Sequence, residues 1–291
     1  MGTLMKTFET TQPIAVVVDV SVRADIWIVA GNRTDTVVNV QPRSATRALD
    51  LKVAEQATVD YTEGRLQVRL HPLRRYSWFG DGGAVDITIE VPIGCSLELK
   101  SGMGDLHCEG EFGSAELKTE MGHVRMDHCT DLRVHTGMGD VTLERVAGRA
   151  EIKTGSGKVR IREIDGIASV KNGNGGTHIV DAAGELKVSA ANGDVTLERA
   201  GATTTIKASN GDITVGEVAR GTLTLQTAAG SLAIGVLEGS AAWLDLSTKY
   251  GRVRNGLDAT TGPRETDAKV EIRARSAYGD ITVRRSPGPT R

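Results

Sequence analysis

Aromatic residues are scarce in this sequence, which holds three Phe, four Tyr and three Trp among 291 residues. Aromatic rings usually provide much of the buried area of a globular core, so this core must be built from Val, Ile, Leu, Ala and Thr. Proline is also rare, with 7 residues, whereas glycine is abundant, with 35. This composition excludes a collagen-like, a disordered or a disulfide-stapled chain.

Neither sign of charge predominates, because the sequence has 35 Lys and Arg and 37 Asp and Glu, which gives a formal net charge of -2. A dedicated nucleic-acid binder normally has a basic excess, so we expect no nucleic-acid partner. The three cysteines, Cys95, Cys108 and Cys129, form no CxxC pair. We expect them to be reduced, half-buried and structural.

Long hydrophobic runs are missing as well. The longest early apolar run, residues 14–18, ends at Asp19 and is too short to span a bilayer. No apolar stretch follows Lys6, so no signal peptide is visible, and Lys6 stands where a myristoylation signal requires Ser or Thr. We therefore expect a cytoplasmic protein.

The dominant feature of the sequence is an internal repeat. The segments NGDVTLERA, from Asn192, and NGDITVGEV, from Asn210, superpose without gaps. The glycine of this motif recurs about every 18 residues, with wider spacing toward the end: Gly104, Gly122, Gly139, Gly157, Gly175, Gly193, Gly211, Gly230, Gly251 and Gly279. A regular period of this length is typical of solenoids and related arrays.

Each repeat carries the alternating pattern of two short strands. After the glycine, apolar residues occupy every second position, as in Val195 and Leu197, and a second alternating stretch precedes it, as in Leu186 and Val188. No helical period intrudes, and no stretch is long enough for a crossover helix.

The pattern predicts an all-β fold: a single elongated β-solenoid of about ten coils, each with two strands and roughly 18 residues. Like strands would stack on like strands, which gives two facing parallel sheets around a core too thin for many rings. An antiparallel meander folded into a twisted sandwich also satisfies the alternation and is the alternative.

The column that precedes the glycine holds runs of identical residues. Three Met are followed later by three Asn and by two Tyr: Met103, Met121 and Met138; Asn174, Asn192 and Asn210; Tyr250 and Tyr278. Stacked coils favour such runs, because Asn amides hydrogen-bond along a ladder and Tyr rings stack. We predict a structural ladder at Asn174, Asn192 and Asn210, although recent duplication of repeats would give the same runs.

Residues 1–94 are less regular, with strand-like segments at residues 14–20, 25–29, 36–40, 58–61, 65–70 and 85–91. A solenoid needs its open end covered, so we interpret this region as an N-terminal β cap continuous with the rod. Solenoid repeats then occupy residues 95–285, and residues 286–291 form a tail. No linker is visible, and we expect one elongated domain.

The repeats resemble a known family. The units TGMGDVTLE, NGDVTLERA, SNGDITVGE and SAYGDITVR, with the preceding segment VDITIEVPIGCSLELKSGMGDL, resemble the bacterial β-strand-repeat family of putative adhesins of unknown function. The segments TDTVVNVQPRS and AAWLDLSTKYGRV are similar to its actinobacterial members. The resemblance implies a β-solenoid-like fold and no known catalytic residues. An adhesin requires export, and the sequence shows no export signal.

Two groups of residues are candidates for metal binding. Aspartates that follow repeat glycines, such as Asp194 and Asp212, resemble those of calcium-binding nonapeptide repeats, but the second half of each repeat has no matching glycine-rich turn. We interpret them as acceptors for backbone N–H groups in tight turns. Stacked coils would also place Asp105, His107 and His123 on one outward face, as a candidate transition-metal site or as surface side chains without a ligand.

One segment of residues 73–83 gathers five side chains of interest in an aromatic-poor chain: Arg74, Arg75, Tyr76, Trp78 and Phe79. It is either a partner-binding or membrane-touching tip, with rings as anchors and arginines for acidic groups, or a cover over the open coil end.

No GxSxG, HExxH or P-loop motif occurs, so we expect neither an enzyme nor a cofactor. The favoured function is a non-enzymatic scaffold or protein-interaction module whose sheet faces bind an unidentified protein partner. One alternative is a filament-forming structural protein, a homo-oligomer made by end stacking. Another is a metal- or ligand-binding sensor that uses the Asp/His turn edge. A peripheral membrane contact rests on the aromatic segment alone.

Overall fold

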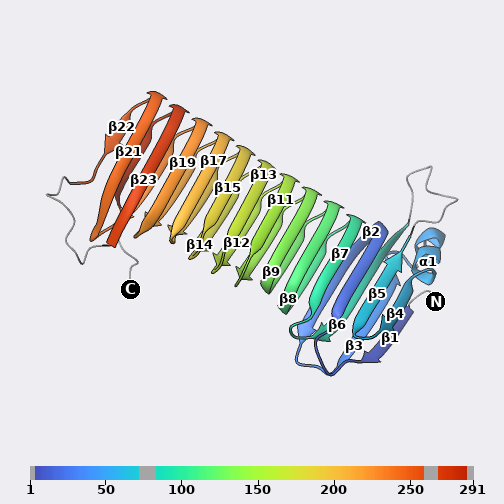
Figure 1. Cartoon of the computed structure of the whole chain (residues 1–291). Coiled ribbons are helices and arrows are strands. Elements are labelled where there is room, and N and C mark those ends of the chain that lie inside the picture. Colours follow the sequence, from blue (N-terminus) through green and yellow to red (C-terminus); the bar gives the residue numbers. More distant parts are fainter. Residues whose placement is uncertain (1–3, 72–82, 259–267, 287–291) are drawn as a thin grey trace. The chain divides into compact units, whose positions relative to one another are not determined.

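The computed structural model describes residues 4–71, 83–258 and 268–286 (Figure 1). The chain divides into two compact units, Met1–Ala147 and Gly148–Arg291, which are treated in turn. Strands dominate both units, and the described residues contain one helix, α1 (Ala48–Glu55). The prediction of an all-β solenoid with parallel stacking is confirmed, and the antiparallel meander is wrong.

The strands of unit 1 are β1 (Leu4–Glu9), β2 (Ala15–Gly31), β3 (Asp35–Pro42), β4 (Thr58–Thr62), β5 (Arg65–Leu70), β6 (Ala84–Pro92), β7 (Ser96–Met103), β8 (Leu106–Met121), β9 (Val124–Met138) and β10 (Val141–Val146).

The strands of unit 2 are β11 (Ala150–Ser156), β12 (Val159–Ile164), β13 (Ala168–Asn174), β14 (Thr177–Ala182), β15 (Leu186–Asn192), β16 (Val195–Ala200), β17 (Thr203–Asn210), β18 (Ile213–Val218), β19 (Gly221–Ala229), β20 (Leu232–Leu237), β21 (Ser240–Tyr250), β22 (Val253–Asn255), β23 (Ala268–Tyr278) and β24 (Ile281–Ser286).

Unit 1 is a stack of coils whose long strands turn a corner and take part in two sheet layers. The first part of β8 pairs in parallel with β2, from Leu106 to Glu109, and its last part pairs in parallel with β7 and β9. At the outer end, β1, β3 and β4 add antiparallel pairs to this parallel stack.

The order of coils in unit 1 differs from their order in the sequence. The first half of β2 lies between β5 and β7, and its second half lies between β6 and β8. The coil made by β5 and β6 is therefore outside β2, although it follows β2 in the chain. The long strand β2 is consequently hydrogen-bonded along both of its edges.

Unit 2 consists of two layers of parallel strands. The front layer of Figure 1 runs β11, β13, β15, β17, β19, β23, β21, and the back layer runs β12, β14, β16, β18, β20, β24, β22. Here too the order is exchanged, because the coil β23–β24 is inserted between β19–β20 and the outermost coil β21–β22.

The core between the layers is aliphatic, as the composition requires. In β15, for example, Leu186 and Val188 are buried while Lys187 and Ser189 point outward and are exposed. Among the described aromatic residues, only Phe112 is buried. Close stacking thus accounts for the shortage of rings, because aliphatic side chains fill the narrow space between the layers.

Helix α1 was not anticipated, because residues 48–55 show no clear helical period. Asp50 on this helix is buried, and its two carboxylate oxygens accept hydrogen bonds from the backbone N–H groups of Ala84 (3.0 Å) and Ser44 (3.2 Å). One buried side chain therefore ties α1 to the start of β6. No helix in the described part of the chain is long and apolar enough to cross a membrane.

Candidate functional site

The structure places Asn174, Asn192 and Asn210 in register at the ends of β13, β15 and β17. The Nδ2 atom of each later Asn donates to the Oδ1 atom of the one before it, at 2.9 Å in both pairs. Further along the same edge, the rings of Tyr278 and Tyr250 stack with centroids 4.9 Å apart and planes 14° apart. These side chains hold the turn edge of neighbouring coils together.

The aspartates after the repeat glycines also join neighbouring coils. The Asp194 carboxylate accepts the backbone N–H of Asp212 at 2.9 Å, and the Asp212 carboxylate accepts that of Ser231 at 2.7 Å. Each side chain thus caps the equivalent turn of the next coil rather than its own turn. In this arrangement the carboxylates link the turns of successive coils.

The residues of the candidate metal site have other contacts. The Asp105 carboxylate accepts the backbone N–H of His123 (2.8 Å), and Nδ1 of His123 accepts the backbone N–H of Asp140 (3.0 Å). The His107 ring stacks on Trp27, with centroids 5.3 Å apart. Nowhere in residues 4–71, 83–258 and 268–286 do three His, Cys, Asp or Glu side chains gather closely enough to hold a metal ion.

The predicted tip cannot be placed, because Arg74, Arg75, Tyr76, Trp78 and Phe79 lie outside the described residues. That prediction stays a prediction.

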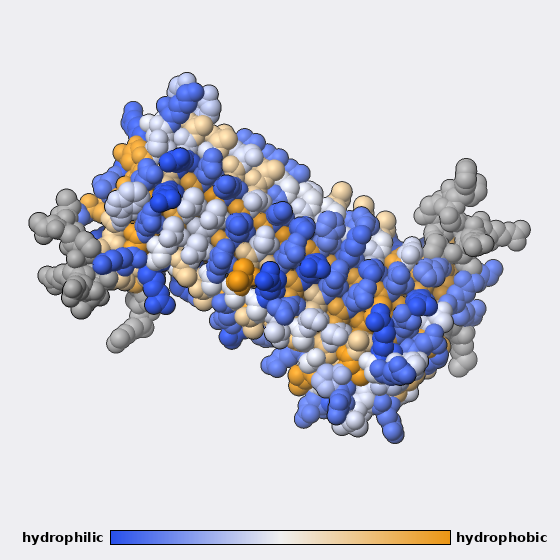
Figure 2. All heavy atoms as spheres, viewed as in Figure 1, coloured by the Kyte–Doolittle hydropathy of each residue, from blue (hydrophilic) through white to orange (hydrophobic). Residues whose placement is uncertain are grey.

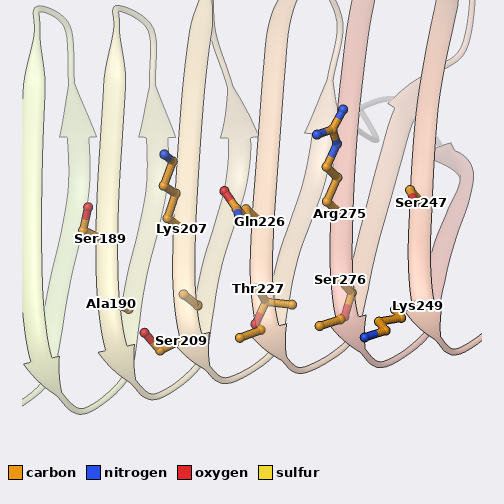
Figure 3. A pocket seen from close by; sticks show the side chains of 13 residues that line it. Ser189, Ala190, Lys207, Ser209, Gln226, Thr227, Ser247, Lys249, Arg275 and Ser276 are labelled. Carbon is orange, nitrogen blue, oxygen red and sulfur yellow. The ribbon is translucent and has the colours of Figure 1, made fainter.

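An open hollow of about 860 Å³ lies on the front layer of unit 2 (Figure 3). It crosses five neighbouring strands: β15, β17, β19, β23 and β21. One row of outward side chains is in register across them: Ser189, Lys207, Gln226, Arg275 and Ser247. Two positions further along β17, β19 and β23, the outward residues Ser209, Ala228 and Ala277 have small side chains. The surface is therefore recessed there, next to the longer side chains of the first row.

We call the outward side of the front layer the basic face. Across its described strands, the cations outnumber the acids by eight to three: Lys153, Lys171, Lys187, Lys207, Lys249, Lys269, Arg273 and Arg275 against Glu151, Asp245 and Glu271. In Figure 2 the surface over unit 2 shows many hydrophilic side chains, in blue, with paler and some orange ones between them.

Each acid on the basic face already has a cation beside it. Glu151 pairs with Lys153, Glu271 pairs with Arg273 at 2.5 Å, and Asp245 pairs with Arg275 at 3.4 Å.

Five lysines on the basic face then remain without an acidic partner among the described residues: Lys171, Lys187, Lys207, Lys249 and Lys269. Lys249 instead lies over the ring of its neighbour Tyr250, with Nζ 5.2 Å from the centroid. The face therefore carries an unneutralised positive charge, although the whole chain is slightly acidic.

The cysteines offer no reactive thiol. All three are free and buried. Burial raises the pKa of the Cys129 thiol from 9.0 to about 12, and burial likewise raises the pKa values of Cys95 and Cys108. A raised pKa lowers the fraction of thiolate, the form in which cysteine acts as a nucleophile, so burial disfavours nucleophilic chemistry at these three positions.

Sequence reasoning missed the hollow and the basic face. The signal was present in the outward positions of the repeats, where Lys171, Ser189 and Lys207 occupy equivalent places. An alignment of the outward positions of successive repeats would reveal these residues. The position of Arg275 in that row follows only from the exchanged order of the last coils.

Several solved structures align with nearly the whole length of this chain. A putative lipid binding protein from Parabacteroides distasonis is 10% identical and covers 96% of each chain, with a TM-score of 0.39. A putative adhesin from the same species is 10% identical, with 96% of each chain covered and a TM-score of 0.37. A putative cell adhesion protein from Clostridium sporogenes is 10% identical and covers 97% of this chain and 98% of its own, with a TM-score of 0.22.

No curated protein matches the chain. The family model described as Toastrack DUF4097 matches residues 15–288. The predicted relationship to a β-strand-repeat family agrees with this match, whereas the actinobacterial origin stays a prediction. Because the match extends over nearly all of both units, the chain belongs to the Toastrack DUF4097 family.

Proposed function

We propose that this protein is a non-enzymatic binding module that holds a negatively charged partner on the basic face of unit 2. The observation that carries the proposal is the set of five lysines on this face that have no acidic partner among the described residues, two of which, Lys207 and Lys249, line the open hollow. Positive surfaces of this kind attract and orient acidic partners.

The fold under the face suits binding rather than chemistry. Neighbouring strands of the front layer are hydrogen-bonded in register, and the amide ladder and the Asp side chains fix the turn edge. The outward side chains are therefore presented on a rigid support, which limits the entropy lost on binding.

We further propose that the protein is a cytoplasmic scaffold. Its solenoid would have about ten coils, and residues 1–94 would cap one end of it.

Soluble polyglutamate, an acidic polypeptide, is a direct probe of this function. We expect it to bind at low ionic strength and to bind the variant Lys171→Gln/Lys207→Gln several-fold more weakly. The matched control is Arg160→Gln/Arg284→Gln, which removes the same charge from strands β12 and β24 of the back layer. The proposal fails if neither polyglutamate nor any other polyanion binds, or if both double variants lose affinity equally.

Self-association is a second candidate, favoured by the outermost coil of unit 2. Among the described strands, β21 pairs in its layer with β23 alone, so its other edge is unpaired. Trp243 on β21 and Val253 on β22 are 57% and 44% exposed. Unpaired edges with exposed apolar residues promote pairing with another chain. Sedimentation that shows only monomer over a wide concentration range would contradict this candidate.

A further inference from the structure

The five lysines of the basic face that have no acidic partner among the described residues are spread over an area rather than along a line. From β13, which carries Lys171, to β21, which carries Lys249, there are five strand spacings, or about 24 Å. Lys269 is in register with Ala241, eight residues before Lys249 on the neighbouring strand, which adds about 26 Å along the strands. A charge distribution with two similar dimensions matches an extended anionic surface.

Exposed aromatic side chains border the same area. Trp243 points outward from β21 beside Glu271 and is 57% exposed. The stacked rings of Tyr250 and Tyr278 are 56% and 59% exposed at the turn edge. Trp and Tyr with an apolar body and a polar tip are the residues that settle at the boundary between lipid headgroups and acyl chains.

We propose that the partner of the basic face is the surface of an anionic lipid bilayer, on which unit 2 lies peripherally through its lysines and Trp243. This inference rests on the proposed function and names its ligand. The long stems of Lys171 and Lys207 allow their ammonium groups to reach headgroup phosphates while the strands stay parallel to the surface. Such binding needs no membrane-spanning segment.

The hollow provides the basic face with a binding site for individual lipid headgroups. Lys207, Arg275 and Lys249 line it together with the hydroxyls of Ser189, Ser209 and Ser247. Ammonium, guanidinium and hydroxyl donors are the groups that hold phosphate oxygens. Lys207 has no acidic partner among the described residues, so its charge is available to a headgroup.

Single-stranded nucleic acid fits the face less well, because it requires a series of aromatic platforms for successive bases. The described strands of the basic face offer one outward aromatic ring, that of Trp243 at one border, among lysines, arginines, small side chains and hydroxyls. An acidic polypeptide fits the charge but makes no use of the exposed rings. The lipid surface is the partner that uses both the lysines and the rings.

The test uses the full chain with vesicles of phosphatidylglycerol mixed with phosphatidylcholine, and with vesicles of phosphatidylcholine alone. We expect binding to the first and not to the second, with an affinity that falls as salt is added. Each lysine near an anionic surface contributes about fivefold in binding, so Lys171→Gln/Lys207→Gln should lose about 25-fold. The control Arg160→Gln/Arg284→Gln should lose much less, because its charges lie on the back layer.

Tryptophan emission provides a second readout. Wild-type protein should show a blue shift on the phosphatidylglycerol vesicles, and Trp243→Phe should lose most of that shift while its unfolding curve stays unchanged. Absence of vesicle binding, equal losses in both double variants, or an unaltered shift in Trp243→Phe would each overturn the inference. Binding to polyglutamate without binding to vesicles overturns the lipid assignment and leaves the proposed function standing. If neither polyglutamate nor the vesicles bind, both the lipid assignment and the proposed function are wrong.

Discussion

Asn192 donates a hydrogen bond to Asn174 over 2.9 Å and at the same time accepts one from Asn210, also over 2.9 Å. Replacement of Asn192 by Ala removes both bonds from an exposed edge. We expect the free energy of unfolding to fall by about 1–2 kcal/mol, measured by urea denaturation. Ser189→Ala on the same strand serves as the control, because Ser189 is exposed and the change should be within about 0.5 kcal/mol. Equal effects of the two substitutions would show that the ladder adds nothing.

Gly193 has no room for a side chain. Its φ is +130°, and a Cβ atom there would lie 2.3 Å from the carbonyl oxygen of Gly175 in the neighbouring coil. Gly193→Ala should therefore destabilise the protein by about 3 kcal/mol or more, since the stacked backbones cannot separate. Gly176→Ala is the matched substitution, because its Cβ would be 3.8 Å from the nearest atom, and thermal unfolding should distinguish the two. A mild effect at Gly193 would contradict the close stacking.

The buried thiols predict how stability depends on pH. The pKa of Cys129 is raised by burial from 9.0 to about 12 in the folded state, and burial also raises that of Cys108. Above about pH 9 the unfolded chain releases thiol protons that the folded chain keeps, so ionisation favours unfolding. The free energy of unfolding should then fall by about 1.4 kcal/mol per pH unit for each such thiol, as measured by urea denaturation across that range.

The double variant Cys108→Ala/Cys129→Ala separates this effect from the ionisation of Lys and Tyr. It should be less stable at neutral pH, because methyl-sized cavities remain, yet its stability should decline more gently as the pH rises. Equal slopes for the variant and the wild type would contradict the predicted contribution of the thiols.

Asp50 holds helix α1 against the start of β6. Asp50→Ala would leave the buried backbone N–H of Ala84 and the part-buried N–H of Ser44 without their acceptor, and we expect the free energy of unfolding to fall by about 2–3 kcal/mol. Glu55→Ala, at the exposed end of the same helix, should change stability by less than about 0.5 kcal/mol. Hydrogen exchange should show α1 opening first in the Asp50 variant and unchanged in the Glu55 variant.

The repeat predicted which residues face inward with good accuracy. Val195 and Leu197, chosen from the alternation, are buried on β16, and the stretch that begins at Leu186 forms β15. This succeeded because a period of two and a recurring glycine are local properties, visible in each repeat without knowledge of its neighbours.

The neighbours of each coil were not predictable in the same way. The alternating pattern predicts that Tyr278 ends a strand. It does not predict that this strand lies between the strand that ends at Ala229 and the strand that ends at Tyr250. Exchanging two coils leaves the inward and outward positions of both unchanged, so the pattern of hydrophobic residues does not record the exchange. The hollow escaped prediction for the same reason, since its row of side chains depends on which coil lies beside which.

The exchanged coils have a mechanical consequence. Strand β2 has hydrogen-bonded partners on both edges, and so do β23 and β24. A pull transmitted along any of these strands must shear two parallel ladders together, whereas an outermost strand would peel away bond by bond. Within each unit, tension is thus borne by interior strands, and we expect single-molecule stretching to show abrupt rupture of a whole unit instead of gradual unwinding coil after coil.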